Sequence, residues 1–366
     1  MSKSKVIIIG GFLGAGKTTS ILSLAKFLQE RYKNIAVITN DQGSQLVDTN
    51  FLAREGIYVK EVTGGCFCCN YDDFSQKISQ LIEEKNPDII LSEPVGSCTD
   101  LIATIYRPMT RYLADKFTVA PLSVVVDPKK IMQFSGNGAL SLYPNEIKYL
   151  FNKQIEEADI IVLNKIDLLS QEELITAQNI IKKNFPEKVL ISISAKENQN
   201  INLWVDKIEE TNHKDDSTME VDYHIYGKAE AYLGWLNTSV NLSSPEKFHI
   251  GAFANEFIEL LKDRFKEEKV EIAHLKIYGI SNTDGIKASL TGLSENVDFS
   301  GNISQSDYSA TMIINARINI DPERLKAYVV DVLEDISAKR NILFNNVKTE
   351  CFMPKQPTPK YRMSSR

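Results

Sequence analysis

Residues 6–19 read Val-Ile-Ile-Ile-Gly-Gly-Phe-Leu-Gly-Ala-Gly-Lys-Thr-Thr, and this stretch decides the fold. The apolar residues predict a short buried strand, the glycines predict a turn, and a helix is expected to begin after them. Residues 11–18 match the phosphate-loop motif G-x-x-x-x-G-K-[ST] at every position. Because glycine accepts backbone angles that a side chain resists, such a loop can direct its N–H groups at a phosphate. The sequence therefore predicts a phosphate-binding site at the start of this helix.

Two side chains of this loop have separate predicted roles. Lys17 should reach the β- and γ-phosphates of a nucleotide, and the Thr18 hydroxyl should bind Mg²⁺. A plain glycine turn is the alternative, and the strand–loop–helix context disfavours it. The predicted phosphate site comprises Gly11, Gly14, Ala15, Gly16, Lys17, Thr18 and Thr19.

The composition indicates a soluble globular protein that is long enough for two domains. The 366 residues are 43% apolar and 25% charged, with a net charge of −6. This acidic balance disfavours nucleic acid as a partner, and no apolar run approaches the ~20 residues of a membrane span. The short apolar run near the N-terminus leads into the phosphate loop, so we interpret it as a strand rather than a signal peptide. We expect a cytoplasmic protein whose five cysteines stay reduced.

The pattern of the first half predicts a doubly wound α/β domain with a mostly parallel sheet, and the second half predicts a smaller α+β domain. A buried strand is expected at 35–39, and further strands at 58–62, 87–92, 119–126, 159–163, 189–193, 231–242, 272–280, 286–290 and 308–318, with loops or turns at 135–138 and 282–285. The predicted parts are residues 1–212 (phosphate-loop domain), 213–221 (polar linker), 222–352 (α+β domain) and 353–366 (a basic tail with prolines, expected to be mobile).

Carboxylates follow two predicted strands at their C-terminal ends, where ligands of open α/β sheets bind. Asp41, in the sequence N-D-Q-G, is placed to approach Mg²⁺ or the attacking water, although it can instead cap the next segment. Glu93, in the sequence E-P-V-G, fits a position that holds Mg²⁺ through water. Gly96 of the same sequence can turn its N–H toward the γ-phosphate. We expect Asp41 and Glu93 to act together with Lys17 in catalysis.

The sequence N-K-I-D at 164–167 predicts recognition of guanine. The Asp167 carboxylate would accept from the N1–H and the exocyclic amine of guanine, which adenine does not offer. Asn164 would brace the loop, and the aliphatic part of Lys165 would cover the base. A backbone N–H for guanine O6 would come from the loop after the next predicted strand, which consists of Ser194, Ala195 and Lys196. We therefore expect GTP as the nucleotide.

Three of the five cysteines lie within four positions, at Cys66, Cys68 and Cys69. An extended backbone would point Cys66 and Cys68 to the same side, and a turn would bring Cys69 inward. Three thiolates favour Zn²⁺ and also suit other borderline or soft metals. Cys98 is a candidate fourth ligand, although we favour a core role for it. The alternative for the whole cluster is a set of small buried side chains.

The order of these motifs, GGFLGAGKTT, ITNDQG, GGCFCC, SEPVG, NKID and SAK, followed by a small C-terminal domain, resembles the CobW-like GTPases, a group related to UreG and HypB. The resemblance implies a GTPase that delivers or inserts Zn²⁺, Co²⁺, Ni²⁺ or a similar metal, with help to cobalamin or metallocofactor assembly as one form of this role. By position, Cys66, Cys68 and Cys69 match the metal motif of the group. The chain departs from the group in having N-D-Q-G where N-E-x-G is common, and in lacking a histidine-rich stretch.

We expect the partner to be a client metalloprotein or a cofactor-dependent enzyme, and a homodimer is possible. Our hypothesis is that GTP orders residues 40–48 and 93–97, which flank the cysteine loop in sequence, and that hydrolysis releases the metal. The main alternative is a GTP-dependent partner-binding switch, or a reactivator of a cofactor-dependent enzyme, that transfers no metal. A phosphate-loop kinase is a third possibility, which N-K-I-D disfavours.

Overall fold

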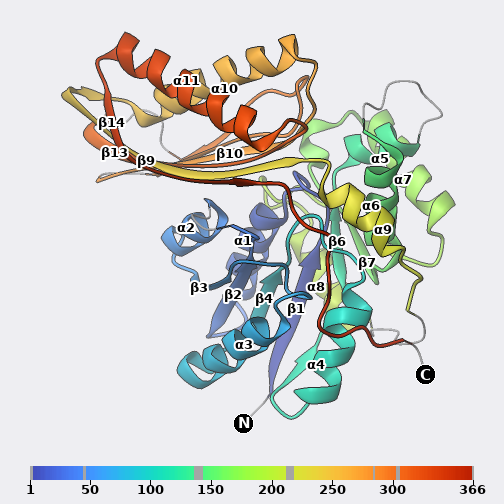
Figure 1. The fold of residues 1–366 in the computed structure, drawn as a ribbon. Coiled ribbons are helices and arrows are strands. Elements are labelled where there is room, and N and C mark those ends of the chain that lie inside the picture. Colours follow the sequence, from blue (N-terminus) through green and yellow to red (C-terminus); the bar gives the residue numbers. More distant parts are fainter. Residues whose placement is uncertain are drawn as a thin grey trace. The chain divides into compact units, whose positions relative to one another are not determined.

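A computed structural model describes residues 3–43, 47–135, 143–211, 218–282, 285–301 and 306–364. The chain divides into two compact units, which are described separately here (Figure 1). Unit 1 comprises Met1–Gln42, Leu52–Gly227 and Gln356–Arg366, and unit 2 comprises Gly43–Phe51 and Lys228–Lys355. A short segment of the first half of the sequence therefore belongs to unit 2, and the end of the chain belongs to unit 1.

Unit 1 is built on a parallel sheet. Among the described residues it has eight strands, seven in the order β3-β2-β4-β1-β6-β7-β8, while β5 pairs with β1. The strands β2, β4 and β7 are buried at every residue, as expected for a parallel sheet covered by helices on both faces. The strands are β1 (Ser4–Gly10), β2 (Ile35–Asn40), β3 (Tyr58–Val62), β4 (Ile89–Glu93), β5 (Phe117–Val119), β6 (Ser123–Val126), β7 (Ile160–Leu163) and β8 (Val189–Ser192).

The strand order reverses direction at β1, which makes the sheet doubly wound. The chain runs from β1 toward β2 and β3 on one side, and from β6 toward β7 and β8 on the other. Because such crossovers are right-handed, helices of the two directions cover opposite faces. The predicted α/β fold class is confirmed. The helices of unit 1 are α1 (Lys17–Leu28), α3 (Tyr71–Lys85), the π-helical turn η1 (Ile102–Tyr106), α4 (Arg107–Tyr112), α5 (Pro128–Ser135), α6 (Asn145–Glu156), the 3₁₀ turn η2 (Ile166–Leu168), α7 (Gln171–Asn184), α8 (Ile201–Glu210) and α9 (Tyr223–Glu230).

Unit 2 is an antiparallel sheet with helices on one face (Figure 1). In the described residues its strand order is β12-β11-β10-β13-β9-β14. Apolar side chains of α10 and α11, including the fully buried Phe253 and Phe257, pack on the sheet and form the core. The elements are β9 (Gly234–Phe248), α10 (Ile250–Glu267), β10 (Ile272–Ser281), β11 (Gly285–Leu290), β12 (Asp298–Gly301), β13 (Asp307–Ile318), α11 (Pro322–Arg340) and β14 (Leu343–Phe352).

Helix α2 (Val47–Arg54) begins in unit 2 and ends in unit 1. Within unit 2, the backbone N–H of Val47 donates to Asn315 Oδ1 at 2.9 Å. Asp48 forms ion pairs with Lys276 at 2.7 Å and with Lys287 at 3.6 Å. Residues 47–51, which follow the predicted Asp41 switch in sequence, therefore belong to the antiparallel unit.

Several expectations are corrected or fall outside the described residues. The strand predicted at 119–126 is two strands, β5 and β6, because Pro121 lies between them and has no N–H for a ladder. The strands β12 and β14 were not predicted. The predicted loop at 135–138, the turn at 282–285 and the linker at 213–221 lie partly outside the described residues. None of the helices that the structure describes is long and apolar enough to cross a membrane.

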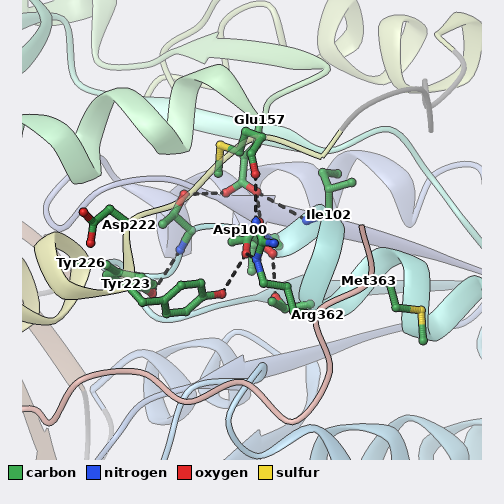
Figure 2. Close-up of polar contacts among 12 residues, drawn as sticks. Asp100, Ile102, Glu157, Asp222, Tyr223, Tyr226, Arg362 and Met363 are labelled. Atoms are coloured by element: carbon green, nitrogen blue, oxygen red, sulfur yellow. Dashed lines mark hydrogen bonds and ion pairs between the residues drawn. The ribbon is translucent and has the colours of Figure 1, made fainter. Parts of the chain in front are cut away.

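A buried carboxylate supports the start of η1. Glu157 accepts from the Leu101 N–H at 2.6 Å and from Thr99 Oγ1 at 3.2 Å (Figure 2). Burial, together with the neighbouring Asp100 charge, raises the pKa of Glu157 well above its ordinary value. The hydrogen bonds to the charged form only partly offset this burial.

Replacing Glu157 with glutamine should flatten the dependence of stability on pH. A folded-state pKa above the ordinary 4.5 means that the folded protein holds a proton that the unfolded chain releases. Stability should therefore fall as pH rises from about 4.5 toward the raised pKa, by up to about 1.4 kcal/mol per pH unit. Urea unfolding of both proteins from pH 4.5 to 8, followed by Trp204 fluorescence in a Trp235→Phe background, measures this slope. Identical slopes for the two proteins would contradict the prediction.

Candidate nucleotide and metal sites

The predicted phosphate loop lies between β1 and α1, at the C-terminal edge of the sheet. Gly11, Gly14 and Gly16 have φ values of +134°, +78° and +90°, in the region that favours glycine. A Cβ added at Gly11 would lie 2.2 Å from the carbonyl oxygen of Val125, so the loop also requires glycine there for space. Lys17 is buried, and its Nζ donates to the Gly11 carbonyl at 2.9 Å. The loop therefore holds one buried cation among backbone groups.

The structure brings two of the predicted Mg²⁺ ligands together. Thr18 Oγ1 donates to Glu93 Oε1 at 3.0 Å, although 75 residues separate them in sequence. This is possible because β1 and β4 are neighbours and end at the same edge of the sheet. Gly96 packs closely on the phosphate loop, since a Cβ there would lie 2.6 Å from Leu13 Cδ2 and 3.0 Å from Lys17 Nζ. The predicted switch sequence E-P-V-G therefore touches both the threonine and the lysine of the loop.

The predicted base-reading residues form one connected network. Asn164 donates to the Ala15 carbonyl at 3.0 Å and accepts from the Ala195 N–H at 3.0 Å, so it joins the phosphate loop to the S-A-K loop. Ser194 Oγ donates to Asp167 Oδ1 at 2.6 Å and holds that carboxylate in place. The exposed Lys196 completes the S-A-K loop.

Sequence reasoning missed Asp127, which follows β6. Its Oδ2 accepts from Lys165 Nζ at 2.8 Å. Burial opposes ionisation, but the Lys165 charge and hydrogen bond outweigh it and lower the pKa of Asp127. The ion pair thereby fixes the ammonium group of Lys165, the residue predicted to cover the base. A carboxylate directly after the apolar run VVV was the available signal.

The three clustered cysteines converge, but by a different backbone path from the one expected. The sulfur of Cys66 lies 3.1 Å from that of Cys68 and 3.1 Å from that of Cys69, and the other two sulfurs are 3.8 Å apart. The backbone is a turn rather than an extended segment, since the N–H groups of Cys69 and Asn70 both donate to the Cys66 carbonyl. The turn, rather than alternation along a strand, directs the thiols to one point.

The geometry of this cluster fits a tetrahedral metal. Among the residues that the structure describes, Cys66, Cys68 and Cys69 form the group of possible metal ligands, and their sulfur atoms all lie within 4.8 Å of one another. Zinc–sulfur bonds of about 2.3 Å at tetrahedral angles place sulfurs about 3.8 Å apart. One pair already has this spacing, and the other two need to open by about 0.7 Å. An all-sulfur donor set suits Zn²⁺ or another soft or borderline ion.

The thiols perturb one another through hydrogen bonds. Hydrogen bonding with the Cys68 thiol, and then with those of Cys69 and Cys98, lowers the pKa of Cys66 well below its ordinary value. For the same reason the pKa of Cys68 is raised well above its ordinary value, and that of Cys69 is raised to about 11. Cys98, which we favoured as a core residue, is buried and also contacts Cys66. Among these three thiols, Cys66 is therefore the one whose pKa is lowered.

Asn40, which sequence reasoning did not single out, connects the cysteine loop to the end of β2. Its Nδ2 donates to the carbonyls of Val62 at 3.0 Å and Gly65 at 2.8 Å. Its Oδ1 accepts from the N–H of Phe67 at 2.9 Å. Asp41 is the next residue, and its own N–H donates to the Val62 carbonyl. The predicted catalytic residue Asp41 is therefore the immediate neighbour in sequence of the residue that braces the cysteine loop.

The fold and these loops define a phosphate-loop α/β domain that is joined to an antiparallel α+β unit. Residues 5–191 match the family described as CobW/HypB/UreG, nucleotide-binding domain. The chain therefore belongs to the CobW/HypB/UreG family, and the resemblance inferred from its motifs is confirmed.

Individual relatives each match about half of the chain. It is 32% identical over 191 residues to the zinc chaperone YeiR of Escherichia coli (strain K12), covering 50% of this chain and 53% of that protein. It is 32% identical over 212 residues to the urease accessory protein UreG of Aliarcobacter butzleri, covering 55% of this chain and 95% of that protein. A crystal structure of HypB from Helicobacter pylori in complex with nickel covers 57% of this chain and 90% of its own, with a TM-score of 0.39 and 18% identity. The chain spans about half the length of the zinc chaperones that it matches.

Proposed function

We propose that this protein is a GTP-hydrolysing metallochaperone that binds Zn²⁺, or a similar ion such as Co²⁺ or Ni²⁺, at Cys66, Cys68 and Cys69 and delivers it to a client metalloprotein or cofactor-dependent enzyme. The observation that carries the proposal is the Asn40 brace, which connects the strand end bearing Asp41 to the loop bearing the thiols. Membership of a family that includes zinc chaperones and UreG supports it. The ion is cargo, so its site must both bind and release.

The nucleotide half of the cycle rests on the buried groups around the phosphate loop. Lys17 would leave the Gly11 carbonyl for the β- and γ-phosphates and offset their charge. Thr18 and Glu93 would hold Mg²⁺, which supplies further positive charge to the phosphates. Asp41 would orient the attacking water. Asn164 would keep the base-reading and phosphate-binding loops in register, so that Asp167 meets guanine.

The nucleotide-binding and metal-binding parts of the proposed cycle are coupled because Asn40 supports both the end of β2 and the cysteine loop. A change at Asp41 moves the end of β2, and Asn40 carries that movement to the backbone on both sides of Cys66. Small changes in sulfur spacing alter the fit to a metal, because the thiols need to open by less than 1 Å to reach tetrahedral spacing. GTP and its hydrolysis would then favour different arrangements of the same thiols.

The test is the zinc affinity of the protein with a non-hydrolysable GTP analogue and with GDP. We expect the two Kd values to differ by about tenfold or more, which corresponds to about 1.4 kcal/mol of coupling. Equal Kd values would remove the coupling, since a ligand with equal affinity for both states shifts nothing. If the Cys66/Cys68/Cys69→Ser variant still activated the client, a partner-binding switch without metal transfer would replace the proposal.

Replacing Asn40 with alanine should abolish the nucleotide dependence of zinc binding while leaving GTP binding intact. The substitution removes the three hydrogen bonds of the Asn40 side chain, which join the end of β2 to Val62 and to Gly65 and Phe67 of the cysteine loop. The ratio of zinc Kd values with GTP analogue and GDP should fall toward one, as measured by chelator competition. Asn184→Ala, at the exposed end of α7, is the matched control and should keep the wild-type ratio. An unchanged ratio in Asn40→Ala would contradict the role of the brace.

A further inference from the structure

The C-terminal segment, residues 356–364, lies against the cysteine loop within unit 1. The N–H of Lys360 donates to the Cys68 carbonyl at 2.9 Å, and the backbone of Thr358 hydrogen-bonds to the Cys69 sulfur. The ammonium group of Lys360 pairs with Asp72, in the first turn of the helix that follows the loop. The segment that was expected to be mobile thus contacts two of the three proposed metal ligands.

Aromatic contacts continue this attachment. The ring of Tyr361 meets the ring of Tyr71 edge-on, with 5.2 Å between centroids, and lies 5.5 Å from the ring of Tyr112. Tyr71 begins α3 directly after the cysteine loop and is 4% exposed. Edge-to-face pairs of this kind contribute beyond their buried area, so the segment is held by side chains as well as by backbone.

The next residue of the segment is anchored to a buried carboxylate. Arg362 Nε pairs with Asp100 Oδ2 at 2.7 Å, and Tyr223 donates to the same oxygen at 2.8 Å (Figure 2). Asp100 is 1% exposed, and its φ of +63° is unusual for a residue other than glycine. Burial raises the pKa of Asp100, and the hydrogen bonds from Tyr223 and Arg362 together with the Arg362 charge oppose this effect.

Beyond this anchor the segment joins η1 and α4. The Met363 N–H donates to the Ala103 carbonyl at 2.9 Å, and Arg107 Nη1 donates to the Met363 carbonyl at 3.2 Å. Asp100 itself lies four residues after Gly96, the end of the predicted switch sequence E-P-V-G. The segment therefore connects the metal loop to the stretch that follows the second predicted switch.

Prolines favour this bound form. Pro357 and Pro359 flank Thr358 and restrict the unbound segment to extended conformations, which lowers the entropy lost when it binds. Pro357 is buried, whereas Thr358 and Lys360 are exposed, so the segment covers the loop as a thin strip. A strip with few buried side chains opens more easily than a packed element.

We propose that residues 356–364 are a latch that shields the thiols of the cysteine loop and slows the entry and exit of the ion, with the Arg362–Asp100 pair as its anchor. The effect of the latch on the ion rests on the proposed metal-binding role. The shielding of the thiols is a property of the metal-free protein. Movement of the stretch after E-P-V-G shifts Asp100 and loosens the anchor, so the latch opens as the nucleotide state changes.

The decisive experiment measures thiol alkylation in the full-length, metal-free protein. Wild type, Arg362→Ala and a chain ending at Lys355 are treated with N-ethylmaleimide, and the rate at each cysteine is read by peptide mass spectrometry. We expect Cys68 and Cys69 to react about tenfold faster in both variants, because opening is no longer opposed by the anchor. Cys351 in β14 of unit 2 provides an internal reference whose rate should not change.

A matched control and a second readout complete the test. Arg31→Ala removes an exposed arginine of unit 1 that pairs with Glu209, and should leave the thiol rates at the wild-type values. Zinc transfer to a chelator should be faster by a similar factor in Arg362→Ala, whereas Arg362→Lys should restore part of the protection. If Cys68 and Cys69 react at wild-type rates in both variants while thermal unfolding shows them folded, the latch is wrong. If wild-type thiols bind no zinc, the proposed function fails, and the alkylation rates still decide the shielding.

Discussion

Replacing Asp167 with asparagine should lower the affinity for GTP by roughly 10²–10⁴ and give the protein affinity for xanthosine triphosphate. A carboxylate accepts two hydrogen bonds from guanine, and bonds to a charged group are worth about 1.5–3 kcal/mol each, or about 3–6 kcal/mol together. Xanthine carries an oxygen in place of the exocyclic amine, so the amide of asparagine can donate where the carboxylate accepted. Ser194 can still donate to the new amide oxygen, so the loop should keep its shape.

Calorimetric titration with GTP, xanthosine triphosphate and ATP measures this change. Asp206→Asn, on α8, is the matched control and should keep the wild-type preference for GTP. A GTP affinity within about threefold of wild type in Asp167→Asn, a change of less than about 1 kcal/mol, would mean that Asp167 does not contact the base. The guanine specificity predicted from N-K-I-D would then be wrong.

Replacing Cys66 with serine should weaken zinc binding by more than about a hundredfold, because a direct ligand contributes more than the outer groups whose loss costs about 10–100-fold. Cys66 makes both of the 3.1 Å sulfur contacts in the cluster. Hydrogen bonds with the neighbouring thiols also lower the pKa of Cys66, which favours the thiolate form that binds a metal. A serine hydroxyl keeps the size but not the soft, charged donor.

Competition with a zinc chelator at fixed pH measures the loss. The matched control is Cys351→Ser, which removes a partly buried thiol of unit 2 that contacts Glu323. GTP affinity should be unchanged in both variants, which separates loss of the metal ligand from loss of the fold. Wild-type zinc affinity in Cys66→Ser would place the metal elsewhere on the chain and end the proposed role of the cysteine loop.

Some of this architecture could be predicted because the signals are local. The phosphate loop requires glycine at fixed positions, and N-K-I-D and S-A-K each follow an apolar strand, so parallel strands bring them to the same edge. The contact between Thr18 and Glu93 follows from this rule once β1 and β4 are neighbours.

Other features had no local signal. Asn40 is an ordinary asparagine in sequence, and only the tertiary fold turns its amide toward the cysteine loop. The segment 356–364 has no period of two or of 3.6 residues, because it is held by backbone bonds and single anchors. Two local signals were overlooked: Asp127 directly after an apolar run, and Pro121, whose missing N–H divides the strand predicted at 119–126.

The path of the chain means that neither unit can be cut out as a continuous piece. Residues 43–51 contribute Val47 and Phe51 to an apolar cluster with Tyr278 and Ile313 of unit 2. A fragment ending near residue 212 would carry this strip without its partners, while a fragment from residue 228 onward would lose the Asp48 charge that faces Lys276 and Lys287. We therefore expect each unit to be stable only when one chain carries both. A gene that separates the two units should yield two unstable proteins.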